Sequence, residues 1–502
     1  MTFLKFSSGV VTGLREPGLE TLKEGIKWLY PGLGFKRWLL VTLVGLLVAL
    51  FGGLLLTEHW APQWISGATS ATFREAISFP FYAGPVVLTT GIVMVTWGMY
   101  RAGRAVADII LPHQGRQLVE NLYYRRYLEK GPKIVALGGG TGLSVLLRGM
   151  KEYTSNITAV VTMTDDGGSS GRLRNEMGML PPGDLRNCLL ALADTEPLLE
   201  QLFQHRFRES KSLEGHSFGN LFLAAMTEMM GFEQAIREFS KVLAVRGKVL
   251  PVTLDPITLN ARFDDGMVST GQTQIVDRHK TIERISLSPE NCRPMPDVLE
   301  AIGEASAIVL GPGSLYTSVL PNLMVPGVKE AIRDSSALCF YICNMMTQPG
   351  ETGEMNASAH LEALYRHGCE DLVDVVIVNT DTTIPEHLAE KYRLEGAVPV
   401  AVDNENLSRW NLEILQAHLL AGGDLAHHNG RKLAVLILEK VVEREAGLEG
   451  LWAYTFMSLN SEYRRARKEM GSLAYHPLSS TQKRLRRFLA RAFKNRNETG
   501  GG

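Results

Sequence analysis

The sequence predicts an α/β protein with a Rossmann-like, mostly parallel sheet, helices on both faces, and a two-helix transmembrane hairpin in front of it. Three observations predict this. Strand-like apolar runs alternate with helical patterns from Lys133 onward, glycine-rich turns follow several of these runs, and two long uncharged stretches lie near the N-terminus. With 502 residues and 45% hydrophobic content, the chain can bury one large core or two ordinary ones.

The two uncharged stretches predict the hairpin. Trp38–Leu56 contains no charged residue and, at about 1.5 Å per residue, can cross most of a hydrocarbon core. Pro80–Tyr100 is a second such stretch, although prolines and glycines interrupt it, and a buried core helix is its alternative. A signal peptide is a poor interpretation of the first stretch, because the run is long, starts late and lacks a convincing small-residue cleavage site.

Basic residues at the ends of these stretches predict the orientation. Lys36 and Arg37 precede the first helix, and Arg101 and Arg104 follow the second, whereas Thr57–Phe79 between them has a single arginine. By the positive-inside rule both ends of the hairpin lie in the cytoplasm. We therefore expect a multi-pass cell-membrane protein whose soluble domain is cytoplasmic.

The whole chain divides into five predicted parts. They are a cytoplasmic N-terminal segment (1–36), the hairpin (37–104), a linker helix (105–132), a nucleotide-binding domain (133–447) and a basic C-terminal tail (448–502). Within the tail, Thr481–Asn497 is rich in lysine and arginine without an acid, and apolar residues recur in it at helical spacing. Such a helix suits an anionic membrane surface, and a disordered basic or RNA-contacting tail is the alternative.

Overall charge and cysteine content exclude two classes of protein. The formal net charge of −1 argues against a globally basic nucleic-acid binder, so we expect no nucleic-acid partner. The 5 cysteines include no C-x-x-C pair, which indicates a reducing compartment and no disulfide framework.

Alternating strands and helices define the nucleotide-binding domain. The strand candidates are Lys133–Leu137, Ile157–Met163, Val249–Leu254, Ala307–Leu310, Leu338–Ile342 and Val373–Val378. The helical candidates are Leu143–Glu152, Leu185–Ala193, Phe218–Met230, Phe232–Ala244, Val328–Asp334 and Ala357–His367. Strands this continuously apolar are typical of a parallel sheet covered on both faces, where ligands bind beyond the carboxyl ends of the strands.

The loop after the first strand is rich in glycine. It contains Gly138, Gly139, Gly140, Thr141 and Gly142, and an apolar helical pattern follows. Backbone N–H groups at such a turn suit a phosphate, and an ordinary tight turn is the alternative. The spacing fits neither G-x-G-x-x-G nor a Walker A loop, which argues against NAD binding and ATP hydrolysis.

The loop after the second strand combines acids, hydroxyls and arginines. Its candidate ligand-binding residues are Asp165, Asp166, Gly167, Ser169, Ser170 and Arg172. The carboxylates suit ribose or sugar hydroxyls or a divalent cation, and Arg172 and Arg174 suit a phosphate. The alternative is a solvated turn with an aspartate helix cap.

Two shorter segments add polar candidates. Asp184 either lines the ligand site or caps a helix beginning at Leu185, and Arg186 and Asn187 then lie in its first turn. His216 and Asn220 add an imidazole and an amide, and a structural role for the histidine is the alternative.

A second glycine-rich loop follows the strand Ala307–Leu310. Its candidate residues are Gly311, Gly313, Ser314, Tyr316 and Thr317. Two such turns in one sheet can hold a diphosphate and a base from opposite sides. The sequence shows no Ser-His-acid order, no H-E-x-x-H and no zinc cysteine set, so we assign no catalytic residue and no metal ligand.

Six strings in order, GGGTGLS, TDDGGSSGRLR, PPGDLRNCLLALAD, HSFGNL, GPGSLYTSVLPNL and YICNMMTQPGET, resemble the YvcK-like branch of the CofD-like family, the gluconeogenesis factors. The resemblance covers Lys133 to Val442. It implies a Rossmann-type fold that binds UDP-sugars, notably UDP-N-acetylglucosamine, with roles in carbon partitioning, cell shape and cell-wall precursor supply and no established catalysis. The related CofD branch transfers a phospholactyl group with magnesium.

The resemblance also implies a layout for the site. Gly138–Gly142 and Gly311–Ser318 would flank the diphosphate and uridine, with the three aspartates opposite and Asn344 of the last string nearby. The first hypothesis is a membrane-tethered UDP-sugar-binding regulatory protein, a homo-oligomer acting through cell-envelope regulatory proteins. The alternative is a transferase that uses Asp165 and Asp166 with magnesium. Two departures from the family pattern are Gly271-Gln272, where Gly-Glu is common, and the N-terminal hairpin.

Overall fold

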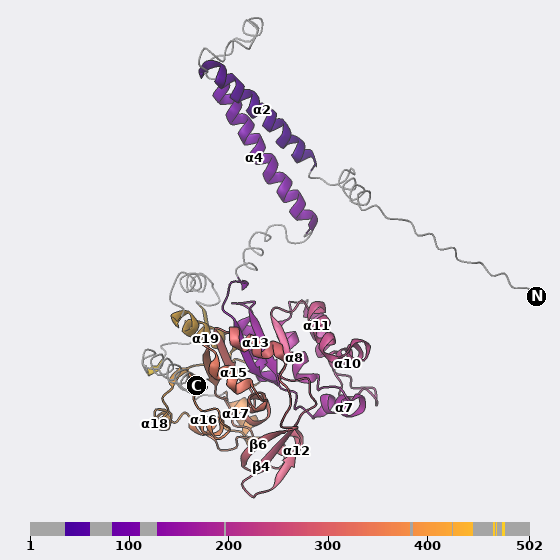
Figure 1. The fold of residues 1–502 in the computed structure, drawn as a ribbon, viewed down its shortest axis with the longest axis vertical. Helices are drawn as coiled ribbons and strands as arrows, with labels where there is room; N and C mark the ends of the chain where they lie inside the picture. The colour runs from indigo at the N-terminus through magenta and orange to yellow at the C-terminus, as the bar shows by residue number, and fades with distance from the viewer. Residues whose placement is uncertain are drawn as a thin grey trace, which may run out of the picture. The chain divides into compact units, whose positions relative to one another are not determined.

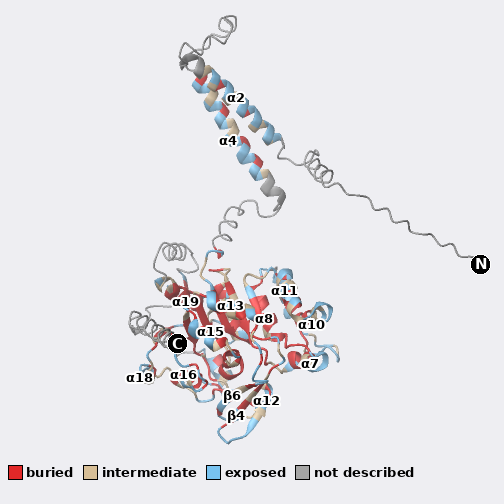
Figure 2. Ribbon diagram, viewed as in Figure 1, coloured by how far each residue is buried: buried red, intermediate tan, exposed pale blue. Residues whose placement is uncertain are grey.

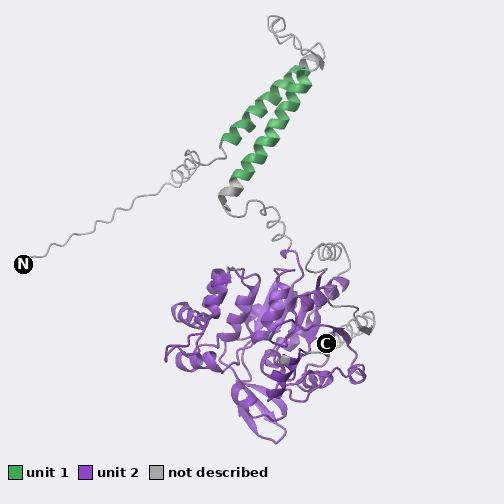
Figure 3. Ribbon diagram, turned by 180° about the vertical axis from the view of Figure 1, so that it is seen from behind, with its two compact units in different colours: residues 1–124 green, residues 125–502 purple. Residues whose placement is uncertain are grey.

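Two compact units, residues 1–124 and 125–502, make up the computed structural model of the chain (Figures 1 and 3). The structure describes residues 36–60, 83–110, 128–194, 197–381, 385–423, 425–444, 465–466, 468 and 474–476. Most of the basic tail, most of the predicted linker helix and the N-terminal segment before Lys36 therefore lie outside the described residues, whereas a few residues of the tail region, among them Ala474–His476, are described.

The first unit is an antiparallel pair of long helices, α2 (Lys36–Trp60) and α4 (Ala83–Ile110). Both are long and apolar enough to cross a membrane, as the sequence predicts. Glycines let their backbones meet, since a Cβ on Gly91 would lie 2.3 Å from the Ala49 nitrogen and one on Gly52 2.4 Å from the Leu88 nitrogen. Many large apolar residues of both helices are exposed, and much of the ribbon of the pair is coloured pale blue (Figure 2).

Arginine and tryptophan gather at one end of this helix pair. The Trp38 and Trp97 rings meet edge to face with centroids 5.1 Å apart. The Arg101 guanidinium lies 4.7 Å from the Trp38 centroid and 5.6 Å from that of Trp97, and Arg37 lies 5.5 Å from Trp38. Aromatic and basic residues of this kind favour a membrane–water interface.

The second unit is built on an eight-stranded sheet in the order β11-β10-β9-β8-β7-β1-β2-β3. Every neighbouring pair is parallel except β10 with β11. The strands are β1 (Ile134–Gly138), β2 (Ile157–Val161), β3 (Lys248–Pro251), β7 (Ala307–Leu310), β8 (Leu338–Ile342), β9 (Val375–Asn379), β10 (Glu413–Ala417) and β11 (Ala474–His476). This confirms the predicted fold class and all six predicted strands, and adds β10 and β11.

Strand β1 lies inside the sheet, third from its β3 edge, at the point where the chain reverses its direction across the sheet. Ile134 pairs with Ile157 of β2 on one side and with Ala307 of β7 on the other. The chain runs outward from β1 through β2 to β3 and, after returning, outward from β7 to β10. This is the topological switch point at which doubly wound sheets bind their ligands.

Helices surround the sheet (Figure 1). They are α6 (Gly140–Met150), α7 (Gly168–Met177), α8 (Gly183–Leu192), α9 (Pro197–Gln204), α10 (Phe218–Met230), α11 (Phe232–Val242), α13 (Pro296–Glu304), α14 (Leu320–Met324), α15 (Val328–Asp334), α16 (Ala357–Arg366), α17 (Glu386–Leu394), α18 (Asn404–Leu407) and α19 (Gly430–Arg444), with a π-helical turn η2 (Leu315–Val319). Right-handed crossovers that leave β1 and β7 in opposite directions place their helices on opposite faces. The six predicted helices are all present, with small differences in their ends.

Helices α6 and α19 cross at two glycines. A Cβ on Gly149 would lie 2.1 Å from the Gly430 carbonyl oxygen, and one on Gly430 would lie 2.0 Å from the Val145 oxygen. The helix after the last parallel strand therefore packs directly on the helix after the first.

A small antiparallel sheet in the order β5-β4-β6 is inserted between β3 and β7. It consists of β4 (Thr258–Phe263), β5 (Val268–Thr270) and β6 (Ile282–Ser288), with α12 (Gln272–Asp277) before β6 (Figure 1). This insertion is not among the elements expected from the sequence. Alternate residues of β4 are buried, so a period of two was present in the sequence and was missed.

Candidate functional site

The two glycine-rich loops meet at the switch point. A Cβ on Gly142 would lie 2.7 Å from the Pro312 carbonyl oxygen, and one on Gly313 would lie 3.4 Å from the Gly139 oxygen. Gly140 and Gly311 have φ angles of +63° and +84°, which favour glycine. The structure thus brings the two loops that the sequence predicts into direct contact, although they are far apart in the chain.

Asp184 faces the first glycine loop. Its Oδ2 lies 2.5 Å from the position of a Cβ on Gly139, and its carboxylate accepts a hydrogen bond from the Gly140 N–H. Burial raises the pKa of Asp184 to about 7, with a contribution from the negative charge of Asp165, while the Gly140 bond and Arg186 act in the opposite direction. Helix α8 begins at Gly183 without a side-chain cap, so the alternative that Asp184 caps a helix from Leu185 is wrong.

The neighbouring aspartates of the second loop point to different partners. Asp165 Oδ1 accepts a hydrogen bond from the Gly167 N–H at 3.0 Å, and its charge acts on Asp184. Asp166 instead accepts hydrogen bonds from the N–H of Thr273 at 2.9 Å and from its hydroxyl at 2.8 Å. Asp165 therefore lies beside the glycine-rich loops, whereas Asp166 is hydrogen-bonded to the helix of the antiparallel insertion.

A buried polar chain connects α7, α8 and α10. The Arg186 guanidinium donates to Asn220 Oδ1 at 2.9 Å, and Asn220 Nδ2 donates to Ser169 Oγ at 2.9 Å. Ser169 Oγ lies 2.9 Å from His216 Nδ1. Arg186 also bonds the Ser217 hydroxyl and donates to Asn187 Oδ1 at 2.8 Å. The permanent charge of Arg186 thus fixes the Asn220 amide and, through it, the serine–histidine pair.

Burial lowers the pKa of the two residues at the ends of this hydrogen-bonded series, Arg186 and His216. It lowers the pKa of Arg186 to about 10, with the nearby Arg206 acting in the same direction. It also lowers the pKa of His216, again assisted by an arginine, Arg172. The imidazole is therefore neutral at pH 7 and suits hydrogen bonding to a ligand better than ion pairing.

The remaining candidates of the second loop are held by the protein itself. Ser170 Oγ accepts from the Gly183 N–H at 3.2 Å. Arg172 donates to the Glu214 carbonyl, and Arg174 donates to the Ile257 carbonyl at 2.6 Å. Each of these bonds uses one nitrogen of the guanidinium and fixes the direction of the side chain.

The loop after β8 forms the other wall. Asn344 Nδ2 donates to Gln348 Oε1 at 3.2 Å, and Gln348 Nε2 donates to Ser314 Oγ at 2.9 Å. The Thr317 hydroxyl donates to Glu351 Oε1 at 2.9 Å. Burial raises the pKa of Glu351 to about 7. Gln348 and Glu351 are not among the candidates expected from the sequence, although the string that contains Asn344 includes both.

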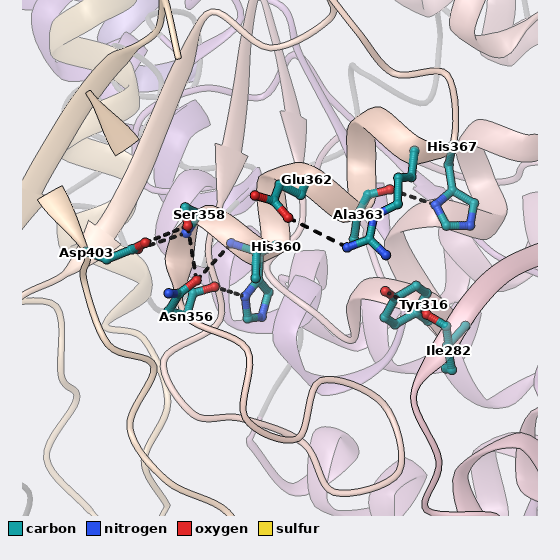
Figure 4. A network of polar contacts seen from close by, with 11 residues as sticks. Ile282, Tyr316, Asn356, Ser358, His360, Glu362, Ala363, His367 and Asp403 are labelled. Atoms are coloured by element: carbon teal, nitrogen blue, oxygen red, sulfur yellow. Dashed lines mark hydrogen bonds and ion pairs between the residues drawn. The ribbon is translucent and has the colours of Figure 1, made fainter. Parts of the chain in front are cut away.

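Tyr316 belongs to the packing beneath this wall. Its side chain is buried, its hydroxyl lies 3.5 Å from the Ile282 carbonyl, and its ring meets the His367 ring at 6.0 Å (Figure 4). The His367 Nδ1–H donates to the Ala363 carbonyl at 2.7 Å, and Nε2 accepts from the Ile285 N–H at 2.9 Å. Tyr316 therefore joins η2 to β6 and α16.

The polar network around α16 in Figure 4 is structural. Asn356 caps the helix by accepting from the Ala359 N–H at 2.9 Å, and Asp403 accepts from the Ser358 N–H at 3.0 Å. His360 Nδ1 donates to the Asn356 carbonyl at 2.8 Å. These polar groups are hydrogen-bonded to one another, so we do not include them in the candidate ligand site.

The donor set can hold magnesium only together with a ligand. No group of three or more His, Cys, Asp or Glu side chains converges among the residues that the structure describes. Asp165 and Asp184 are two hard oxygen donors beside the glycine loops, and Mg²⁺ is commonly held by one or two carboxylates plus substrate phosphates. All 5 cysteines are buried, and none forms a disulfide.

A separate surface hollow of about 740 Å³ lies where α7 ends and α10 turns into α11, lined by Met177, Met179, Met230 and their neighbours. Leu254, shortly after β3, also lines this hollow, but no residue of the two glycine-rich loops does. We assign the candidate site to the switch point, because the polar groups and both glycine loops converge there.

Comparisons with known proteins identify the family and support the fold. The family model described as 2-phospho-L-lactate transferase CofD matches residues 134–420. The "Gluconeogenesis factor" of Bacillus subtilis (strain 168) is 49% identical and covers 62% of this chain and 99% of its own length. A crystal structure from Bacillus halodurans, described as a member of the UPF0052 family, shares 49% identity with a TM-score of 0.59 and covers 61% of this chain and 99% of its own.

A longer relative extends beyond this region. The protein of Nostoc sp. (strain PCC 7120) named "Putative gluconeogenesis factor" is 43% identical and covers 83% of this chain and 93% of its own length. The stretch from Lys133 to the C-terminus is too short to supply that coverage, so the alignment includes residues before Lys133. Part of the N-terminal region is therefore shared with a relative.

Proposed function

The chain belongs to the YvcK-like, gluconeogenesis-factor branch of the CofD-like family, and from this premise we propose that it is a regulatory protein that binds a UDP-sugar, with UDP-N-acetylglucosamine as the first candidate. Binding would occur in the cleft at the switch point. In this proposal the protein links carbon metabolism to cell-wall synthesis and cell shape through cell-envelope regulatory proteins, and it acts as a homo-oligomer.

One observation carries the ligand proposal: the direct contact between the two glycine loops. A Cβ on Gly142 would lie 2.7 Å from the Pro312 carbonyl oxygen, so the two glycine-rich turns, whose backbone N–H groups are the candidate phosphate donors, lie side by side at the switch point of a doubly wound sheet. A diphosphate needs several donors within a few ångströms of one another, which a single turn does not offer. Asp165, Asp184 and the neutral His216 add polar groups that suit sugar hydroxyls.

The helix pair supports a tether to the cell membrane. Its outward-facing side chains are large and apolar, for example Leu40, Leu47 and Val93, and arginines and tryptophans mark one end. In this arrangement the arginine–tryptophan end lies at the cytoplasmic face, where the positive-inside rule puts it. An alkaline phosphatase reporter inserted at Gly67 should be active, and an inactive reporter there would contradict the hairpin.

A second candidate function is a transferase. The family model that matches this chain carries a transferase name, and Asp165 and Asp184 form a two-carboxylate face beside the glycine loops. When bound there, Mg²⁺ would neutralise charge on the phosphates of a nucleotide diphosphate donor. Asp184, which is held by the Gly140 N–H, would orient the donor, and the Ser169–His216 pair would hold one of its hydroxyls.

Isothermal titration calorimetry of the full-length chain in detergent, with UDP-N-acetylglucosamine and UDP, tests the proposal. The variant Gly142→Val forces a side chain against Pro312 and should abolish binding, whereas Gly303→Ala, where a Cβ meets nothing within 4 Å, is the matched control. Lack of binding to the wild-type chain would overturn the UDP-sugar proposal. Turnover of the bound nucleotide would favour the transferase.

A further inference from the structure

The short helix α12 contacts loops on both sides of the switch point. At its first turn, Thr273 donates two hydrogen bonds to Asp166 of the loop after β2. Near its other end, a Cβ on Gly350 of the loop after β8 would lie 2.1 Å from the Val276 carbonyl oxygen. The sheet runs β8-β7-β1-β2, so these two loops flank the pair of glycine loops.

The dimensions of α12 fit such a bridge. Its 6 residues span about 9 Å at 1.5 Å per residue. The ends of β2 and β8 are three strand spacings apart, about 14 Å in all. The side chain of Asp166 on one side and the loop at Gly350 on the other span the rest of the distance between the ends of β2 and β8.

The Asp166 carboxylate fits closely against the start of α12. Gly271, with φ +96°, allows the carboxylate to approach, since a Cβ there would lie 2.4 Å from Asp166 Oδ2. Both bonds from Thr273 go to the other oxygen, Oδ1. Ile275 in the middle of α12 is fully buried and fixes which face of the helix points into the molecule.

We propose that α12 is the cover of the switch-point cleft, and that Asp166 is the positioning residue that holds this cover by capping its first turn. The proposal rests on the proposed function only for the identity of the ligand. It gives Asp166 a different role from Asp165, which stays beside Asp184. A bound ligand leaves when α12 lifts, so the strength of the Asp166–Thr273 contact sets the rate of release.

Two substitutions separate positioning from a charge role. Asp166→Asn keeps an oxygen that accepts both Thr273 bonds, and asparagine is as good a helix cap as aspartate. Asp166→Ala removes the cap altogether. A residue that binds a cation or a sugar through its charge would instead lose function in both variants.

The cover is tested without a ligand by labelling a cysteine in the cleft. In the full-length chain in detergent, Ser314→Cys gives one reactive thiol, because the 5 native cysteines are buried. Loss of a cap of typical strength predicts that Asp166→Ala raises its rate of maleimide labelling about fivefold, with Asp166→Asn close to wild type. Labelling of Ser212→Cys, an exposed position, should be the same in all backgrounds. An unchanged rate at Ser314→Cys in the alanine variant would overturn the proposal.

Dissociation of UDP-N-acetylglucosamine gives the second readout. Asp166→Ala should raise the dissociation rate about fivefold, and adding Thr273→Val should have little further effect because both changes break the same contact. If Asp166→Asn releases the ligand as fast as Asp166→Ala, the positioning role is overturned in favour of a charge role. If the wild-type chain binds no UDP-N-acetylglucosamine, the proposed function fails while the labelling experiment still decides the cover.

Discussion

The Asp184 carboxylate accepts the Gly140 N–H, so a protein carboxyl already lies against the turn that the sequence assigns to a phosphate. Across the cleft, Glu351 accepts from the Thr317 hydroxyl in the second loop. Both carboxyl groups have a pKa raised to about 7, chiefly by burial. An incoming diphosphate therefore meets two groups whose charge changes near neutral pH.

The affinity for a nucleotide diphosphate should depend on pH through Asp184. Below pH 7 this group is mostly protonated and does not repel phosphate, whereas above pH 7 it is charged. In the absence of divalent cations, affinity should fall by up to about tenfold per pH unit above 7, and Asp184→Asn should flatten the profile. Calorimetry from pH 6 to 8.5 measures this. A wild-type profile as flat as that of the variant would contradict it.

The stability of the second unit should fall with rising pH because of Glu351. Its pKa in the folded chain, about 7, lies above the ordinary 4.5. The folded state then holds a proton that the unfolded state has lost, so this stabilisation is complete below pH 4.5 and disappears as the pH rises through 7. Melting temperatures of Glu351→Gln between pH 5 and 8 should change less than those of the wild-type chain. If the melting temperatures of both proteins changed equally with pH, the raised pKa could not belong to Glu351.

Replacing Arg186 should destabilise the second unit. Arg186→Met leaves Asn220 Oδ1 and the Ser217 hydroxyl buried without this donor. Unsatisfied buried groups cost about 1–3 kcal/mol each, so a drop of several degrees in melting temperature is expected. The matched variant Arg208→Met, at an exposed position, should melt like the wild-type chain. Similar melting of both variants would show that the buried chain of polar groups contributes little.

The close packing of α2 against α4 should depend on Gly91 and not on Gly53. A side chain at Gly91 meets the Ala49 backbone, whereas one at Gly53 meets nothing within 4 Å. Gly91→Leu should therefore push the helices apart, and Gly53→Leu should not. Oxidative cross-linking of a Leu56→Cys/Gly84→Cys pair reports their distance, because a Cβ on Gly84 would lie 3.1 Å from the Leu56 side chain. Undiminished cross-linking with Gly91→Leu would refute the close packing.

The sequence predicted the main sheet well, because its strands are continuous apolar runs separated by clear helical patterns. It also predicted which loops would gather, since carboxyl ends of parallel strands share one edge. The direct contact of Gly142 with Pro312 follows from strand order, which local patterns do not reveal. The switch point needs β7 to pair with β1, and that pairing exists only in three dimensions.

Other features could not be predicted from the sequence, and the reasons are physical. Asp165 and Asp166 are adjacent and chemically identical, and only the position of Thr273, distant along the chain, separates their roles. Glu351 gains its raised pKa from burial, which depends on the fold as a whole. The antiparallel insertion is different. Leu259, Ala261 and Phe263 alternate with polar residues, and Asp265-Gly266 forms a hairpin signal, so this element was predictable.

The crossing of α6 and α19 at Gly149 and Gly430 has a consequence for the order of events during synthesis. The ribosome completes α2 and α4 long before it reaches Gly430, whereas α6 cannot find its partner helix until α19 has emerged. If the helix pair inserts as it is made, the nascent second unit matures beside the membrane with the α19-facing side of α6 still uncovered. Helix α19 then covers this side of α6 only after most of the chain has been made.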